Sequence, residues 1–131
     1  MNLAVVIRQV PDLIEPLEVD ASGQSLDLGS AAFSVNESDD HALEQAILPK
    51  ECGGGTVTVV ALDYGDVDNT LYAAAAKGAD RIVKIALDGE PPTPHAAAAM
   101  LAEAIQALGA DLVLDRKSTR LNSSHVAFSR M

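Results

Sequence analysis

The sequence is poor in cysteine, aromatic residues and basic residues. Cys52 is the only cysteine among 131 residues, which excludes an intramolecular disulfide and a cluster of thiolate metal ligands. Aromatic residues make up 3% of the chain and tryptophan is absent, so a platform of rings for stacking nucleobases is not expected. The net charge is −10, with nineteen acidic side chains against nine basic ones, which argues against nucleic acid as a partner.

Long apolar segments are missing as well. No apolar run reaches the roughly 18 residues that cross a bilayer, so direct membrane insertion is not expected. The first residues, Met1 to Ala4, carry no basic side chain and do not resemble a secretory signal. Because the chain has a single cysteine and no such signal, we expect a bacterial cytoplasm or a mitochondrial matrix as its location, and no secretion.

Charge and texture change sharply near residue 115. Residues 1–114 hold five basic and eighteen acidic side chains, a net charge of −13, whereas residues 115–131 carry +3 and show no hydrophobic period. Residues 115–125 read DRKSTRLNSSH, which matches eleven codons in one frame of a common sequencing adapter. We therefore interpret residues 115–131 as a non-native, disordered tail and expect the natural protein to continue beyond Leu114. The alternative is a natural basic tail.

Residues 1–114 alternate between apolar runs and helical patterns. Short runs rich in β-branched residues predict strands at residues 3–7, 56–62, 81–87 and 111–114. Helical patterns predict helices from about Asp39 to Pro49, from Asp66 or Asp68 to Ala76, and from Thr93 to Leu108. Pro49 is expected to kink or end the first helix. A small hairpin is expected around Ser22 and Gly23.

This order of elements predicts an α/β fold, a Rossmann-like, doubly wound parallel sheet that is truncated after its fourth strand. Sheets of this kind bind ligands at the carboxyl ends of their strands, near the point where the strand order reverses. The candidate segments are therefore residues 8–12, 36–40 and 62–66.

Motifs of enzymatic or metal sites are weak. The cluster Gly53–Gly55 follows a helix and precedes a strand, so it reads as a helix stop and not as a phosphate loop. His41 and His95 fall in the first turns of two helices, where we expect exposed side chains and no metal site. Residues 36–40 open a helix at the ligand end of the sheet. Their polar groups either cap that helix or bind an anion or a polar ring edge, and spacing does not decide between the two.

Four segments together resemble the β subunit of electron transfer flavoprotein, and the resemblance covers residues 1–114. Residues 8–12 (RQVPD) are similar to a K-Q-V-P-D motif, and residues 35–46 (VNESDDHALEQA) to N-P/E-F-D-E-x-A-L-E-E-A. Residues 76–81 (AKGADR) are similar to A-x-G-A-D-R, and residues 110–114 (ADLVL) to a P-D-L-V-L strand. Each motif is weak alone, but their order and spacing are specific.

The resemblance implies an electron carrier and not an enzyme, with no catalytic residue of its own. In this family the β subunit forms a heterodimer with an α subunit. FAD, shared with the α subunit, carries electrons from flavin dehydrogenases such as acyl-CoA dehydrogenases of fatty acid oxidation to a quinone oxidoreductase. The usual β subunit also binds a structural AMP, and electron-bifurcating relatives hold a second FAD instead.

By position, the resemblance implies an AMP site made by six residues. They are Val6, Asn36, Glu37, Ser38, Asp39 and Leu62. Val6 and Leu62 would contribute backbone groups. The family's G-x-Q-x-x-D phosphate loop would follow Leu114, where this chain has the residues of the tail. We therefore expect this chain to bind neither AMP nor FAD firmly.

Two other classes of adenine-nucleotide-binding α/β domain remain as alternatives. An ATP-hydrolysing or adenylating enzyme would need a loop rich in glycine and serine after the first strand, which residues 8–12 do not supply. A stress-type nucleotide sensor would need its glycine-rich loop after the fourth strand, in the region of the tail.

Overall fold

The computed structural model describes residues 1–27, 29–89, 91–115 and 127–129. Within these residues the main sheet has five strands in the order β5-β4-β1-β6-β7. The strands are β1 (Asn2–Val6), β4 (Thr56–Leu62), β5 (Arg81–Ile85), β6 (Leu112–Asp115) and β7 (Ala127–Ser129). The first four run parallel, as the apolar runs predicted, and β7 pairs antiparallel with β6.

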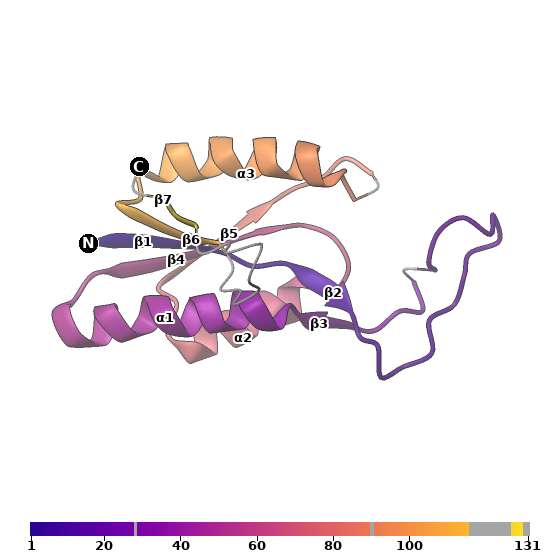
Figure 1. Cartoon of the computed structure of the whole chain (residues 1–131), viewed down its shortest axis with the longest axis horizontal. Coiled ribbons are helices and arrows are strands. Elements are labelled where there is room, and N and C mark those ends of the chain that lie inside the picture. Colours follow the sequence, from indigo (N-terminus) through magenta and orange to yellow (C-terminus); the bar gives the residue numbers. More distant parts are fainter. Residues whose placement is uncertain (28, 90, 116–126, 130–131) are drawn as a thin grey trace.

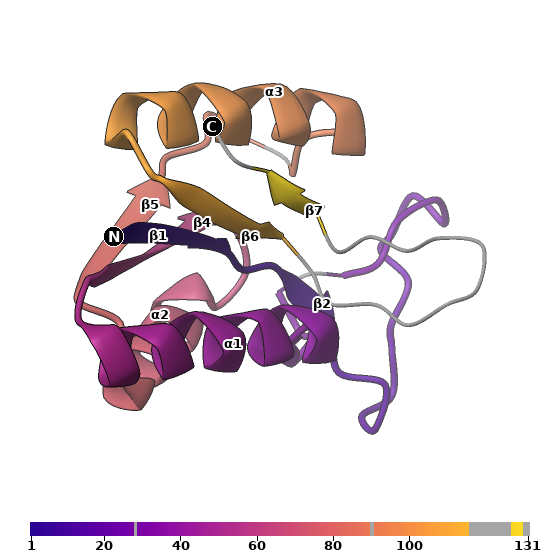
Figure 2. The same cartoon turned by 60° about the vertical axis from the view of Figure 1, so that its left-hand side comes forward.

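The helices cover both faces of this sheet, as Figures 1 and 2 show. The helices α1 (Glu37–Gly53) and α2 (Val67–Lys77) lie on one face, and α3 (Pro94–Leu108) lies on the other. The chain moves outward from β1 to β4 and β5, and then returns to place β6 on the opposite side of β1. The fold is thus the predicted doubly wound α/β sheet, and its order reverses between β1 and β6.

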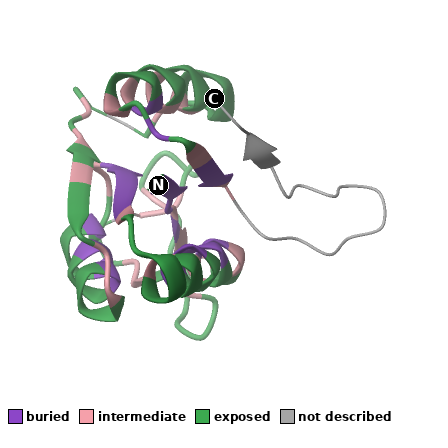
Figure 3. Ribbon diagram, turned by 90° about the vertical axis from the view of Figure 1, so that its left-hand side faces the viewer, coloured by how far each residue is buried: buried purple, intermediate pink, exposed green. Residues whose placement is uncertain are grey.

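The two faces of the sheet are packed to different degrees. Alternate residues of β1 point to opposite faces, because side chains of a strand alternate. Leu3, Val5 and Ile7 join a large core cluster beneath α1 and α2, whereas Ala4 and Val6 join a smaller one beneath α3. Figure 3 shows α3 as mostly exposed, and Ile105 is its one buried residue. The α3 face is therefore the thinner layer of the molecule.

Pro49 was expected to kink or end the first helix, and the prediction of an end there is wrong. The helix α1 continues through Pro49 to Gly53, and the side chain of Pro49 is exposed. Proline removes one backbone donor, but the helix beyond it is held by other contacts. The Lys50 Nζ donates to the carbonyl oxygen of Gly78 at 2.7 Å and to the Asp80 carboxylate at 2.7 Å, which ties this end of α1 to the turn before β5.

A small second sheet was not predicted from the sequence. Its strands β2 (Gln9–Pro11) and β3 (Phe33–Val35) pair antiparallel just beyond the carboxyl end of β1. The segment that joins them projects away from the sheet, described except for residue 28 (Figure 1). Val19 and Leu26 form an antiparallel bridge within it, in agreement with the expected hairpin around Ser22 and Gly23.

The end of the chain differs in part from the expectation of a detached tail. Asp115 is the last residue of β6, and residues 127–129 form β7 beside it. Disorder of the tail as a whole stays a prediction. Most of the predicted tail, residues 116–126 and 130–131, lies outside the described residues. The adapter origin of residues 115–131 stays an interpretation of the sequence.

The glycine cluster ends α1, as predicted, and also brings β4 next to the start of β1. Gly54 and Gly55 adopt positive φ angles of 77° and 134°. The backbone of Gly55 lies so close to the carbonyl group of Met1 that a Cβ atom would collide with it. The next amide, of Thr56, donates to the Met1 carbonyl oxygen at 3.1 Å. The contact aligns β1 with β4 from their first residues.

Replacing Gly55 by alanine should therefore destabilise the protein by about 1–3 kcal/mol, from backbone strain and the collision with Met1. Gly53→Ala is the matched control, because Gly53 is the last residue of α1 and has nothing within 4 Å of its Cβ position. Urea unfolding followed by circular dichroism would measure both variants. Equal midpoints for the two would contradict this account of the strand start.

Candidate functional site

A cavity of about 630 Å³ lies between α3 and the carboxyl ends of the sheet strands. Its size falls within the range of small-molecule sites, roughly 300–1,000 Å³. Apolar residues form most of its wall: Val6, Leu62, Pro91, Pro92, Pro94, Ala97, Ala98, Leu101, Ala102, Ile105 and Val113. Its polar lining comes from Arg8, Tyr64 and Asp115. The cavity exists because the short side chains of α3 do not fill the thinner face of the sheet.

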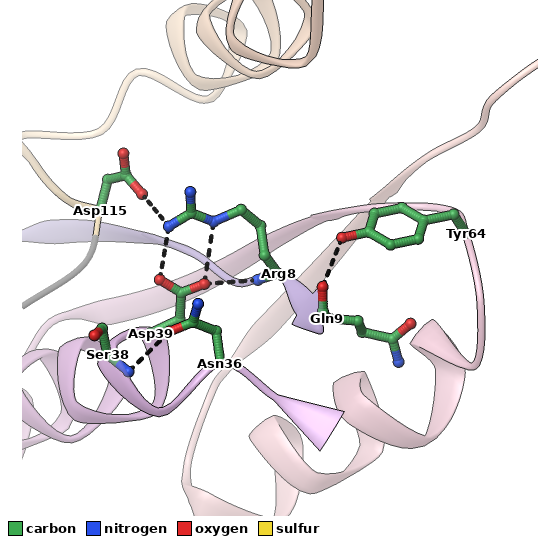
Figure 4. A network of polar contacts seen from close by, with 7 residues as sticks. All are labelled: Arg8, Gln9, Asn36, Ser38, Asp39, Tyr64 and Asp115. Carbon is green, nitrogen blue, oxygen red and sulfur yellow. Dashed lines mark hydrogen bonds and ion pairs between the residues drawn. The ribbon is translucent and has the colours of Figure 1, made fainter. Parts of the chain in front are cut away.

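Arg8 lies at this cavity and is held there by a buried carboxylate. Its Nε and Nη2 atoms donate to the two carboxylate oxygens of Asp39 at 3.2 and 2.9 Å, and its backbone N–H donates to the same group at 2.9 Å (Figure 4). The side chain of Asp39 is 0% exposed and that of Arg8 is 24% exposed. Three hydrogen bonds therefore join the end of β1 to the first turn of α1.

Burial and pairing act in opposite directions on these two groups. Burial lowers the pKa of the Arg8 guanidinium, but the hydrogen bonds and the charge of Asp39 outweigh burial and raise that pKa above its ordinary value. Burial raises the pKa of the Asp39 carboxyl, against the opposing pull of Arg8. The guanidinium stays charged at neutral pH, and Asp39 is the counter-charge that permits its burial.

A second carboxylate approaches Arg8 from β6. The Arg8 Nη2 donates to the Asp115 carboxylate at 3.3 Å, and the side chain of Asp115 is 45% exposed. The contact arises from strand register, because Asp115 pairs with Val6 across the point where the sheet order reverses. Among the described residues, the third nitrogen, Nη1, has no hydrogen-bond partner, and Figure 4 shows it on the side of the guanidinium that faces α3.

Tyr64, in the loop after β4, also lines the cavity. Its hydroxyl donates to the carbonyl oxygen of Gln9 at 2.9 Å, and burial raises the pKa of that hydroxyl. The Gln9 side chain turns to the opposite face, where its Nε2 donates to the Thr70 hydroxyl at 2.7 Å. These bonds connect β2 to the loop after β4 and to α2. The backbone that leaves β1 is thus fixed from both sides.

The structure brings together only some of the residues that the sequence predicted for the site. Val6 and Leu62 both line the cavity. Asn36 caps α1 by accepting a hydrogen bond from the Ser38 backbone N–H at 3.0 Å, so capping describes its side chain. Glu37 is highly exposed beside His41 and is not part of the cavity lining. Asp39 reaches the cavity only through Arg8. None of these observations tests nucleotide binding by the six residues, which stays a prediction.

Sequence reasoning missed the side chains that give the site its charge. The segment 8–12 was a candidate by position, but neither Arg8 nor Tyr64 was singled out, and Asp115 was assigned to the tail. One signal was present in the sequence. An arginine directly after a buried strand and an aspartate in the first turn of the next helix both lie at the same edge of the sheet, so their side chains could have been expected to pair.

Metal ligands do not gather in the described part of the chain, where no group of three or more His, Cys, Asp or Glu residues could hold an ion. His41 and His95 are exposed there, as expected. In the same residues, no helix is long and apolar enough to cross a membrane.

Comparison with known proteins identifies the family. A family model described as the electron transfer flavoprotein domain matches residues 28–127. The chain belongs to this family. The resemblance found in the sequence motifs is thereby confirmed.

Curated members of the family provide closer relatives, all of them β subunits. The electron transfer flavoprotein subunit beta of Methylophilus methylotrophus is 36% identical over 87 residues, which are 65% of this chain and 33% of that protein. The Bacillus subtilis subunit beta is 33% identical over 94 residues, 72% of this chain and 36% of that protein. A mitochondrial subunit beta of Oryza sativa subsp. indica is 30% identical over 95 residues, 72% of this chain and 38% of that protein. The chain spans about a third of the length of these relatives.

Breaking the Arg8–Asp39 pair should cost much of the stability of the fold. We expect Asp39→Asn to destabilise the protein by about 3–5 kcal/mol, because it removes the buried counter-charge of the guanidinium and leaves only the half-exposed Asp115 beside it. The double variant Arg8→Gln/Asp39→Asn should be more stable than Asp39→Asn, since neither partner is then charged. Urea unfolding of the variants measures both effects.

Asp40→Asn is the matched control for this experiment. Asp40 is the next residue of α1 and pairs with Lys77, but the side chains of this pair are 41% and 36% exposed and so much more accessible than that of Asp39. Exposed pairs contribute little, so the change should stay within about 1 kcal/mol. A loss as large as that of Asp39→Asn would show that general charge removal, and not the buried pair, determines the stability.

Proposed function

We propose that this chain is part of the β subunit of an electron transfer flavoprotein, and that it forms the first strands and helices of that subunit's nucleotide-binding domain. The family match over residues 28–127 carries the proposal, supported by several curated β subunits of similar sequence. In this role the chain is an electron-carrier subunit and not a catalyst. FAD shared with an α subunit supplies the redox chemistry when the heterodimer is assembled.

The partners in the proposal are the α subunit, the flavin dehydrogenases that donate electrons and the quinone oxidoreductase that accepts them. Acyl-CoA dehydrogenases are the donors we propose, with fatty acid oxidation as the setting. Relatives from bacteria and from mitochondria favour a bacterial cytoplasm or a mitochondrial matrix as the location.

The proposed ligand of this chain's own residues is AMP in a structural role. The cavity supports the proposal, because it lies where the order of the sheet reverses, and Val6 and Leu62 line it at the ends of β1 and β4. Its apolar walls suit the faces of an adenine ring, and the peptide groups at the strand ends suit the polar edge of the ring. The other four residues of the predicted AMP site, Asn36, Glu37, Ser38 and Asp39, are at the start of α1 and outside the cavity lining, and Asp39 acts on the proposed site through Arg8.

Nucleotide binding by this chain should be weak but specific. We expect AMP to bind with a dissociation constant of about 1 mM, or about −4 kcal/mol, because the family's phosphate loop does not follow β6. We expect no binding of FAD. Ala97→Leu should abolish AMP binding by filling the cavity, whereas Ala99→Leu on the same helix, outside the cavity lining, should not. Calorimetry or chemical-shift titration would measure these effects. Identical titrations for the two variants would show that the nucleotide does not bind in this cavity.

A chimaera tests the assignment to the β subunit. Residues 1–114 would replace the matching segment of the Methylophilus methylotrophus subunit beta, which would be expressed with that organism's α subunit. We expect a yellow heterodimer with a flavin absorption spectrum. A colourless β chain that leaves the α subunit unbound, although it is folded by circular dichroism, would contradict the proposed function.

A further inference from the structure

Arg8 has more hydrogen-bonding capacity than the fold uses. A guanidinium carries five N–H groups on three nitrogens. Asp39 takes up Nε and part of Nη2, and this fixes the plane of the group. Nη1 has no partner among the described residues and lies on the side toward α3, where Arg8 lines the cavity (Figure 4). A positive group is therefore held rigidly at the polar end of an otherwise apolar cavity.

An anion already occupies part of this position. The Asp115 carboxylate lies 3.3 Å from Nη2 and lines the same cavity. It approaches on the edge that Asp39 leaves open. It is also half exposed, so water or a solute can replace it at little cost. The site thus accepts an oxyanion beside Arg8, and in this chain the oxyanion comes from β6.

We propose that Arg8 binds the phosphate of a nucleoside monophosphate whose base and sugar occupy the cavity. This inference rests on the proposed function and adds the residue that recognises the charged end of the ligand. Arginine suits the task, because its planar fork matches phosphate oxygens with two hydrogen bonds. Asp39 is the positioning residue of the site: it orients Arg8 and does not touch the ligand.

The same geometry makes Asp115 an inhibitor of binding. With Asp39 and Asp115 both ionised, two negative charges already surround one positive charge. A phosphate would have to displace Asp115 or share Arg8 with it. Asp115 also opens the segment that we interpret as adapter-derived, so its carboxylate need not belong to the natural site. Removing this charge should increase the affinity for the phosphate.

Three probes separate the contributions: AMP, adenosine and inorganic phosphate, titrated at low ionic strength into the full chain. We expect Asp115→Asn to raise the affinity for AMP about fivefold and to leave that for adenosine unchanged, as befits one partly exposed charge. Asp111→Asn is the matched control. It removes the same charge just before the other end of β6, where Asp111 accepts a hydrogen bond from the Asn2 backbone N–H, and it should leave both affinities unchanged.

The variant Arg8→Gln/Asp39→Asn removes the positive charge together with its buried partner. We expect it to bind AMP no more tightly than adenosine, while urea unfolding confirms that it is folded. Asp115→Asn alone, in which the Arg8–Asp39 pair is intact, provides the second measurement if the double variant does not fold. Phosphate should shift the Arg8 Nε–Hε signal in Asp115→Asn and not the backbone signals around Asp111.

The outcomes distinguish this inference from the proposed function. If AMP and adenosine bind equally well to every variant, the nucleotide site stands and the role of Arg8 is wrong. If neither AMP nor adenosine binds but phosphate shifts the Arg8 signal, Arg8 is an anion site and the assignment of a nucleotide to the cavity is wrong. If no probe affects Arg8, the inference is overturned.

Discussion

The ion pair between Arg8 and Asp39 is the interaction on which the arrangement of this site depends. A carboxylate with no exposed surface must be neutralised, since an unpaired buried charge costs several kcal/mol. The requirement is met only if the backbone beyond β1 passes directly over the first turn of α1. The pair therefore sets the path of the chain where β1 ends, and that path positions β2, Tyr64 and the wall of the cavity.

The uneven packing of the two sheet faces explains why a cavity exists at all. Beneath α1 and α2 the core contains large branched side chains such as Leu3, Leu43 and Val59. On the other face, three of the six α3 residues that line the cavity are alanines, and these small side chains leave space that the sheet does not fill. This space opens at the carboxyl ends of β1 and β6, where the strand order reverses. Topology locates the site, and the composition of one helix gives it volume.

Much of the fold could be predicted from the sequence, because its main elements are encoded locally. The strand at 56–62 has the predicted bounds, and Thr93 and Gly109 delimit α3 as expected. The predicted helix end at Pro49 was wrong, because the loss of one backbone donor on an exposed helix face can be tolerated when Lys50 anchors the helix beyond it. The second sheet was missed, because β2 and β3 are three residues each and pair across a long projecting segment. The ion pair was missed for a similar reason: Arg8 and Asp39 are thirty-one positions apart, and only the fold makes them neighbours.

Arginine suits position 8 because the side chain there neutralises Asp39 and also lines the cavity. The motif that this segment resembles has lysine at the position, and an ammonium group is a single point of charge on a flexible stem. A lysine that neutralised Asp39 would be drawn towards α1 and would have little reach into the cavity. A guanidinium has two usable edges in one rigid plane, so it satisfies Asp39 with one edge and presents charge to the cavity with the other. Arginine at this position thus makes one side chain serve both the fold and the site, and the stability of the pair and the affinity for an anion become linked properties.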